Sequence, residues 1–199
     1  MQQPREISPP LVLASTSPFR KMLLQKLGLA FSTYAPLIDE SPQPGENPAR
    51  LVMRLSLRKA QAAGDKFPDA LIIGSDQVAC IDDIVLGKPG DRKHAIEQLQ
   101  TASGRRVTFY TGLTLLNTAS GNNQTLCEPF IVCFRRLQRD QIERYLDAEQ
   151  PYNCAGSFKS EGLGISLFER LQGDDPNALI GLPLIRLVAM LNTEGIRIP

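Results

Sequence analysis

Residues 11–28 read LVLASTSPFRKMLLQKLG, an apolar run followed by hydroxyl residues and then by a helical pattern. The apolar residues 11–15 are typical of a buried β-strand. Ser17 followed by Pro18 matches the cap and the first position of a helix, and the apolar stripe behind them stops at Gly28. This stretch therefore predicts a strand, a tight turn and a helix.

Apolar runs and helical patterns continue to alternate along the chain, which predicts an α/β domain in which helices cover a sheet. Residues 71–73 form an apolar strand that runs into Gly74-Ser75-Asp76, so we expect an acid at the end of a strand. The runs 107–116 and 125–137 are expected to pair as a long hairpin. The other expected elements are strands at 31–35, 78–81 and 165–171, helices at 48–64, 91–103, 140–148 and 183–191, and a turn at 173–177.

Composition restricts the class of protein. The 199 residues show no internal repeat or linker, which favours one domain. Lys and Arg number 22 against 21 Asp and Glu, a net charge of +1, which argues against a nucleic-acid partner. No run is long and apolar enough to span a membrane, and residues 1–10 lack the apolar core of a secretory signal. We therefore expect a cytoplasmic protein that binds neither membranes nor nucleic acid.

Ser15, Ser17 and Arg20 lie where the first strand passes into the first helix. A helix N-terminus offers free N–H groups and a partial positive charge, and a guanidinium can grip phosphate oxygens with two parallel bonds. These residues are candidates for phosphate binding. An ordinary capped helix with a surface arginine would explain the same pattern.

The second candidate group contains carboxylates and lysines. Asp76 follows a buried strand, where a carboxylate can hold a hard metal ion or take a proton from water, although Asp also forms ordinary turns. Glu40 lies in a proline-rich loop, where a solvated acid is the simpler interpretation. Lys59, Lys88 and Lys159 lie in three separate segments, and a polyphosphate would need such cations, but scattered lysines usually face solvent.

Several ordered motifs together resemble the Maf family of nucleotide pyrophosphatases. The resemblance spans nearly the whole chain and leaves residues 1–10 as an extension outside a single domain at 11–199. The motifs are Leu13-Ala14-Ser15-Thr16-Ser17-Pro18-Phe19-Arg20, Asp39-Glu40, Arg58-Lys59-Ala60, Gly74-Ser75-Asp76-Gln77-Val78, Gly87-Lys88-Pro89, Ser103-Gly104 and Gly181-Leu182-Pro183.

The resemblance implies an elongated mixed sheet with flanking helices, similar to the inosine triphosphate pyrophosphatase fold, with a cleft between two lobes. It also implies homodimers and hydrolysis of a nucleoside triphosphate to a nucleoside monophosphate and diphosphate. Asp76 is then the catalytic base, and Glu40 and Asp76 hold a divalent cation, magnesium or manganese. The phosphates are addressed by Ser15, Ser17, Arg20, Lys59 and Lys88. Lys21 stands where the family often has a second arginine, and it cannot form a planar fork.

Phe19, Gln77 and Glu161 bear on the substrate. The family branch acting on dTTP and UTP usually has Arg, Thr and Gln at these places, whereas this chain is similar to the branch acting on 7-methyl-GTP. Methylation at N7 makes guanine cationic, so an aromatic face at Phe19 would attract it, and Glu161 could accept two hydrogen bonds from the guanine edge. Without the resemblance, Phe19 would be taken as a core residue and Glu161 as a solvated acid.

Two other functions remain open at this point. One is a pyrophosphatase of the dTTP and UTP type. The other is a nucleotide-sensing regulator that keeps the pocket but turns over slowly, because Maf proteins are also linked with septum formation.

Overall fold

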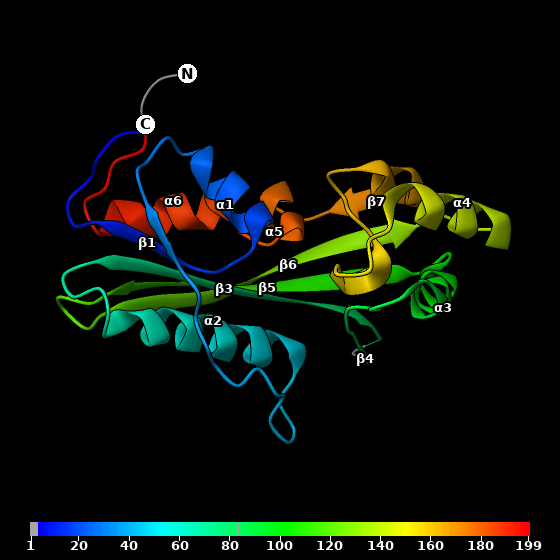
Figure 1. Cartoon of the computed structure of the whole chain (residues 1–199), viewed down its shortest axis with the longest axis horizontal. Helices are drawn as coiled ribbons and strands as arrows, with labels where there is room; N and C mark the ends of the chain where they lie inside the picture. Colours follow the sequence, from blue (N-terminus) through cyan, green and yellow to red (C-terminus); the bar gives the residue numbers. More distant parts are fainter. Residues whose placement is uncertain (1–3, 83) are drawn as a thin grey trace.

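The computed structural model describes residues 4–82 and 84–199, so the first three residues of the expected extension and position 83 lie outside the described part. Within this part the strands form one seven-stranded mixed sheet in the order β2-β1-β3-β5-β6-β7, with β4 paired to β3 (Figure 1). The strands are β1 (Leu11–Ala14), β2 (Ser32–Tyr34), β3 (Leu71–Ile81), β4 (Ile84–Leu86), β5 (Arg106–Asn117), β6 (Asn123–Phe134) and β7 (Phe168–Gln172).

Helices cover both faces of this sheet (Figure 1). The α-helices are α1 (Pro18–Gln25), α2 (Pro48–Gly64), α3 (Arg92–Ala102), α4 (Arg139–Glu149), α5 (Pro176–Ile180) and α6 (Leu184–Thr193), and two 3₁₀ turns are η1 (Ala155–Ser157) and η2 (Leu163–Leu167). The expected α/β class with an elongated mixed sheet and flanking helices is confirmed. No helix of the described chain is both long and apolar enough to cross a bilayer.

The described chain has three apolar cores, of which the smallest packs α2 against β1, β3 and β5, and the two larger lie along the long strands β3, β5 and β6. One core joins β1, α1 and α6 to the first half of β3, and it includes Leu13, Leu23 and Leu187. The other joins α3, α4 and β7 to the far half of the same strands, and it includes Leu99 and Ile142. The long strands thus run through two lobes, and the boundary between the lobes falls near the middle of β3 (Figure 1).

β3 differs from the expected short strand, because it continues without interruption from Leu71 to Ile81. Asp76 therefore lies in the middle of a strand, paired with Gly112 of β5, and the expectation that it ends a strand was wrong. The strand that ends here is its neighbour β1, whose last pair is Ala14 with Gly74. On that side of β3 the next pairing begins only at Ala79, with β4. Asp76 consequently lies on a stretch of β3 that has no paired strand on that side within the described chain.

Gly74 does not end the strand, since its role is to let α2 approach the sheet. A Cβ added at Gly74 would lie 2.0 Å from the carbonyl oxygen of Ser56, and one at Gly112 would lie 2.1 Å from that of Val52. Both distances are far below van der Waals contact, so only glycine allows helix and strand backbones to lie this close. This contact brings Lys59 of α2 over β3.

Other local expectations have mixed outcomes. The hairpin of β5 and β6 is confirmed, and so are the helix starts at Pro18 and Pro48, whose preceding Ser17 and Asn47 side chains cap the helices. The strand expected at 165–171 begins only at Phe168, because η2 occupies the preceding residues. The expected turn at 173–177 passes into the short helix α5.

The described residues before β1 also contact the domain. The backbone of Arg5 exchanges hydrogen bonds with Gly28 and Ala30, and Ile7 packs against the core around β1.

Candidate active site

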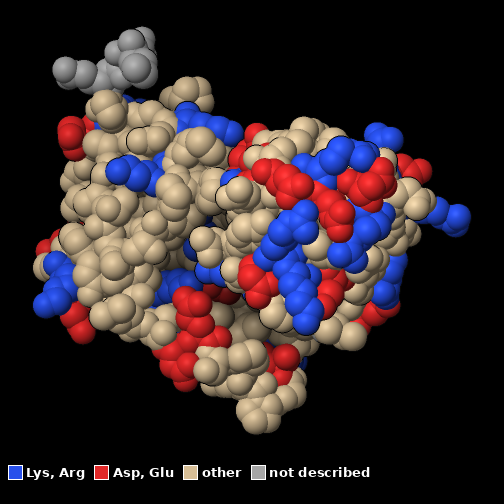
Figure 2. Space-filling model, turned by 45° about the vertical axis from the view of Figure 1, so that its right-hand side comes forward, with Lys and Arg blue, Asp and Glu red and all other residues tan. Residues whose placement is uncertain are grey.

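A cleft of about 870 Å³ lies between the two lobes, where β1 has ended and β3 continues. In Figure 2 the surface is hollowed between the lobes, and basic and acidic side chains both gather at this hollow. Every site residue expected from the sequence lines the cleft. They are Ser15, Ser17, Phe19, Arg20, Glu40, Lys59, Asp76, Gln77, Lys88 and Glu161.

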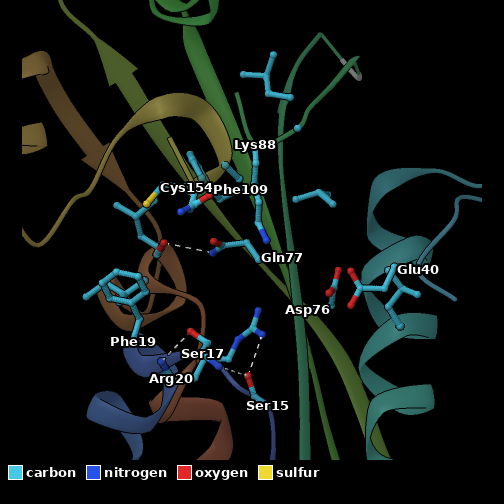
Figure 3. A pocket seen from close by; sticks show the side chains of 18 of the residues that line it. Ser15, Ser17, Phe19, Arg20, Glu40, Asp76, Gln77, Lys88, Phe109 and Cys154 are labelled. Atoms are coloured by element: carbon cyan, nitrogen blue, oxygen red, sulfur yellow. Dashed lines mark hydrogen bonds between the residues drawn. The ribbon is translucent and has the colours of Figure 1, made fainter. Parts of the chain in front are cut away.

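The turn between β1 and α1 forms one wall with hydrogen-bond donors (Figure 3). The Ser15 hydroxyl accepts hydrogen bonds from the backbone N–H of Ser17 at 3.1 Å and from Nη1 of Arg20 at 3.4 Å. Nε of Arg20 donates to the carbonyl oxygen of Gly181 at 2.8 Å, which fixes the guanidinium beside the helix N-terminus. This wall combines a helix N-terminus with a held cation, an arrangement suited to phosphate oxygens.

The pKa of Arg20 reflects the charges around it. Burial lowers this pKa from its ordinary value, while the negative charges of Asp76 and Glu40 act to raise it. An arginine remains protonated in proteins. The electrostatic coupling shows that Arg20 belongs to the same charge cluster as the two carboxylates.

Lys59 joins these carboxylates at the floor of the cleft. Its Nζ lies 2.6 Å from Oδ1 of Asp76 and 2.7 Å from Oε1 of Glu40. Asp76 and Lys59 are buried, whereas the Glu40 side chain is 59% exposed. Two cations, Lys59 and Arg20, therefore balance two carboxylates, and a polyphosphate entering the cleft would require additional positive charge.

The cleft offers few protein ligands for a metal ion. In the described chain, no group of three or more His, Cys, Asp or Glu side chains could hold a metal. Magnesium, however, is commonly bound by one or two carboxylates together with substrate phosphates and water. Glu40 and Asp76 face each other in the cleft (Figure 3), so these residues fit a hard cation that shares its ligands with phosphate.

Arg54 of α2 holds the loop that carries Glu40. Nη2 of Arg54 donates to the carbonyl oxygen of the next residue, Ser41, at 3.0 Å, and the same guanidinium makes two bonds of 2.6 Å to the Glu46 carboxylate. The hydrogen bond from Arg54 lowers the pKa of Glu46 to about 2. This ion pair fastens the loop to α2, the helix that also carries Lys59.

Gln77 lies at the opposite side of the cleft from Glu40. Its Nε2 donates to the carbonyl oxygens of Ala178 at 2.7 Å and Leu179 at 3.2 Å, and lies 2.9 Å from Oγ1 of Thr111. These acceptors require the amide nitrogen to face α5, which turns the Oε1 acceptor the other way. Phe19 is half-buried on α1 in the wall of the same cleft.

Glu161 and Lys88 are exposed side chains of the cleft. Glu161 Oε2 accepts a hydrogen bond from the Ser160 hydroxyl at 3.3 Å. The Lys88 side chain extends into the cleft toward Gln77 (Figure 3). Both come from the lobe that contains α3, α4 and β7, here called the second lobe. The cleft therefore combines groups from both sides of the lobe boundary.

Two further lysines considered from the sequence are placed differently. Lys159 lines the cleft, but its Nζ donates to the backbone carbonyl of Glu149 at 3.0 Å and lies 3.4 Å from the Glu149 carboxylate. Its ammonium is therefore tied to α4. Lys21 is exposed on α1.

Sequence reasoning missed several groups that form the site. Thr111 supports Gln77, and Phe109 and Cys154 line the cleft. The carbonyls of α5 and of Gly181 accept hydrogen bonds from the site side chains. Apart from Gly181, which lies in the Gly181-Leu182-Pro183 motif, these groups have no local sequence signal, because a backbone acceptor carries no residue identity and Thr111 is an ordinary strand residue.

The chain belongs to the Maf family, because the family model described as Maf-like protein matches residues 10–194, which contain every residue of the cleft. Two relatives are each named 7-methyl-GTP pyrophosphatase. The one from Alcanivorax borkumensis is 61% identical over 192 residues, covering 96% of this chain and 98% of that protein. The one from Nitrosococcus oceani is 56% identical over 195 residues, covering 98% of each.

A solved structure shares the fold at much lower identity. The Staphylococcus aureus Ham1 protein aligns with 96% of this chain and 100% of its own, with a TM-score of 0.55 and 13% identity. This likeness shows a common arrangement of strands and helices.

Proposed function

We propose that this chain is a nucleoside triphosphate pyrophosphatase that hydrolyses 7-methyl-GTP between the α and β phosphates, releasing 7-methyl-GMP and diphosphate. The observation that carries the proposal is the cluster of Lys59, Asp76 and Glu40 at the floor of a cleft whose wall is the Ser15–Arg20 turn. The two relatives named 7-methyl-GTP pyrophosphatase, matched over nearly their full length, support the choice of substrate.

Asp76 acts as the general base in this proposal. Its buried carboxylate lines the cleft, where a water molecule could reach it, and the Lys59 ammonium, whose Nζ lies 2.6 Å from Oδ1, orients it. Arg20, Ser15 and Ser17 bind phosphate oxygens in the adjoining wall through the guanidinium and the two hydroxyls, and Lys88 offsets charge from the other lobe. The general base Asp76 and the phosphate-binding groups thus converge on one region of the cleft.

Glu40 and Asp76 would hold a divalent cation, magnesium or manganese, together with phosphate oxygens of the substrate. When bound, such an ion offsets charge on the departing diphosphate and lowers the pKa of a coordinated water. The exposed Glu40 carboxylate can turn from Lys59 toward a ligand, while the buried Asp76 stays fixed.

The nucleobase of the substrate is recognised by Phe19, Gln77 and Glu161. The ring of Phe19 stacks against the cationic 7-methylguanine, an interaction of roughly 0.5–2 kcal/mol. Glu161 accepts hydrogen bonds from the N–H groups of the guanine edge, and Oε1 of Gln77, turned away from α5, is a further acceptor. Uracil and thymine lack the matching set of donors.

The assay that tests this function compares kcat/KM for 7-methyl-GTP, GTP, UTP and dTTP, with magnesium or manganese present, in the wild type and in Glu161→Gln. We expect 7-methyl-GTP to be preferred by the wild type and the preference over UTP to shrink in the variant. A wild-type preference for UTP or dTTP would refute the substrate, and an undiminished preference over UTP in Glu161→Gln would refute the role of Glu161. Tight nucleotide binding without turnover would instead support a nucleotide-sensing regulator.

The protein is further proposed to act in the cytoplasm as a homodimer, the state implied by its family resemblance. Light scattering behind a sizing column gives the mass directly, and a single monomeric peak at micromolar concentration would contradict the dimer. Cell fractionation tests the location.

A further inference from the structure

Two segments of the second lobe carry groups proposed to bind substrate. The Gly87-Lys88 loop follows β4 and supplies a phosphate-binding lysine, and residues 153–161 lead from α4 to Glu161. Helix α3 contacts the second segment, and its half-buried Gln98 contacts both.

The side-chain amide of Gln98 bonds at both ends. Its Nε2 donates to the carbonyl oxygen of Gly87 at 3.0 Å, and its Oε1 accepts from the Ser157 hydroxyl at 2.6 Å. An amide has one donating and one accepting end, and the Gly87 carbonyl can only accept, so these partners fix its orientation. Gly90 N–H adds a second link by donating to the carbonyl of Tyr152 at 3.0 Å.

Ser157 is an unusual partner. It is fully buried and has a φ of +63°, in the left-handed region that non-glycine residues rarely adopt. Such a conformation persists where its surroundings hold it. The bond to Gln98 holds the Ser157 side chain, and the next residue, Phe158, packs edge-on against the rings of Phe109, Phe134 and Phe168.

The direction of the chain beyond Phe158 is also fixed. The backbone N–H of Lys159 donates to the Tyr145 hydroxyl at 3.1 Å, and the Glu149 carboxylate accepts the backbone N–H of Leu163 at 2.7 Å. Glu161 lies between these two anchors. Its position therefore follows from the segment that begins at Ser157.

We propose that Gln98 is a positioning residue that couples the phosphate-binding loop at Lys88 to the nucleobase-binding segment at Glu161. The proposal rests on the function proposed above, which gives Lys88 and Glu161 their roles. Gln98 does not line the cleft and acts through Gly87 and Ser157. Loss of the Gln98 amide should loosen both segments together. This should affect substrate binding and discrimination between nucleobases more than the chemical step.

Gln98→Glu is the sharpest variant, because it keeps the shape and the acceptor for Ser157 but places a carboxylate oxygen against the Gly87 carbonyl. We expect KM for 7-methyl-GTP to rise by up to about tenfold, the scale of one lost hydrogen bond, and kcat to change less than about threefold. The preference for 7-methyl-GTP over GTP should fall as well. Gln100→Glu is the matched control, since Gln100 is exposed on the same helix.

Melting temperatures and dissociation constants for 7-methyl-GTP and GTP are measured on the same proteins. The coupling would be overturned if Gln98→Glu had the same KM, dissociation constants and nucleobase preference as Gln100→Glu. This holds whatever the melting temperature of Gln98→Glu. If the wild type hydrolyses none of the nucleotides, the proposed function fails, while the dissociation constants still decide the role of Gln98.

A double-mutant cycle tests the coupling itself. Lys88→Met and Glu161→Gln should have non-additive effects on 7-methyl-GTP binding in the wild type and additive effects in Gln98→Ala. Equal coupling in both backgrounds would overturn the proposal.

Discussion

Replacing Gly74 with alanine should impair both folding and catalysis, because this glycine sets the distance between α2 and β3. The added methyl would lie 2.0 Å from the carbonyl oxygen of Ser56 and 2.9 Å from the backbone nitrogen of Ala60. A carbon does not approach an oxygen much closer than about 3 Å, so helix and strand must separate by about 1 Å. The neighbouring Lys59 would move with the helix.

Overpacking of this kind typically costs about 1–3 kcal/mol. For a chain of this size, each kcal/mol lowers Tm by about 2–4 °C, so we expect a fall of about 2–12 °C. A misplacement of about 1 Å in an active site can cost about a hundredfold in rate. Because Lys59 Nζ lies 2.6 Å from Asp76, we expect a loss of this order in kcat/KM for Gly74→Ala.

Thermal unfolding measures the loss of stability, and steady-state hydrolysis of 7-methyl-GTP, recorded well below Tm, measures the loss of activity. Gly64→Ala is the control on the same helix, where the nearest atom to the added methyl lies at 3.8 Å, and it should match the wild type or be slightly more stable. If Gly74→Ala kept the wild-type Tm and kcat/KM, the close packing of α2 on β3 could not be what positions Lys59.

Three other substitutions probe the site and its supporting loop. Asp76→Asn should abolish hydrolysis and largely retain nucleotide binding by calorimetry, since the amide keeps the shape and loses the basicity; near-normal turnover in saturating magnesium would remove Asp76 from the mechanism. Arg20→Ala should raise KM and lower kcat together in steady-state kinetics, and an equal loss of binding for a nucleoside without phosphates would assign Arg20 to the base instead. The third, Glu46→Gln, tests the ion pair with Arg54. The pKa of Glu46 is lowered from 4.5 to about 2, so its stabilisation is present above pH 4.5 and is lost as the pH falls toward 2. The Tm difference between wild type and Glu46→Gln should shrink over that range, and a constant difference would contradict the pairing.

Local chemistry made part of the fold predictable. Ser17 with Pro18 and Asn47 with Pro48 are cap pairs whose meaning does not depend on the rest of the chain, and both helices start there. The hairpin of β5 and β6 carried long apolar runs around a turn, and it also formed as expected. These signals come from neighbouring residues, which is why sequence alone contained them.

The remaining features depend on contacts between distant segments. Gly74 looked like a strand end because glycine often is one, whereas here it admits α2. Helix α5 has only five residues, too few for a periodic pattern. The site residues were identified by motif, but their placement in one cleft required the lobe boundary, and the link from Gln98 to Gly87 and Ser157 had no motif at all.

The products formed from 7-methyl-GTP test the central claim most directly. Purified wild-type protein is incubated with 7-methyl-GTP and magnesium, and the reaction is followed by phosphorus NMR, with Asp76→Asn as the inactive reference. We predict that 7-methyl-GMP and diphosphate appear in equal amounts in the wild type only. Release of orthophosphate with 7-methyl-GDP, or no reaction under conditions where the nucleotide binds, would contradict the account.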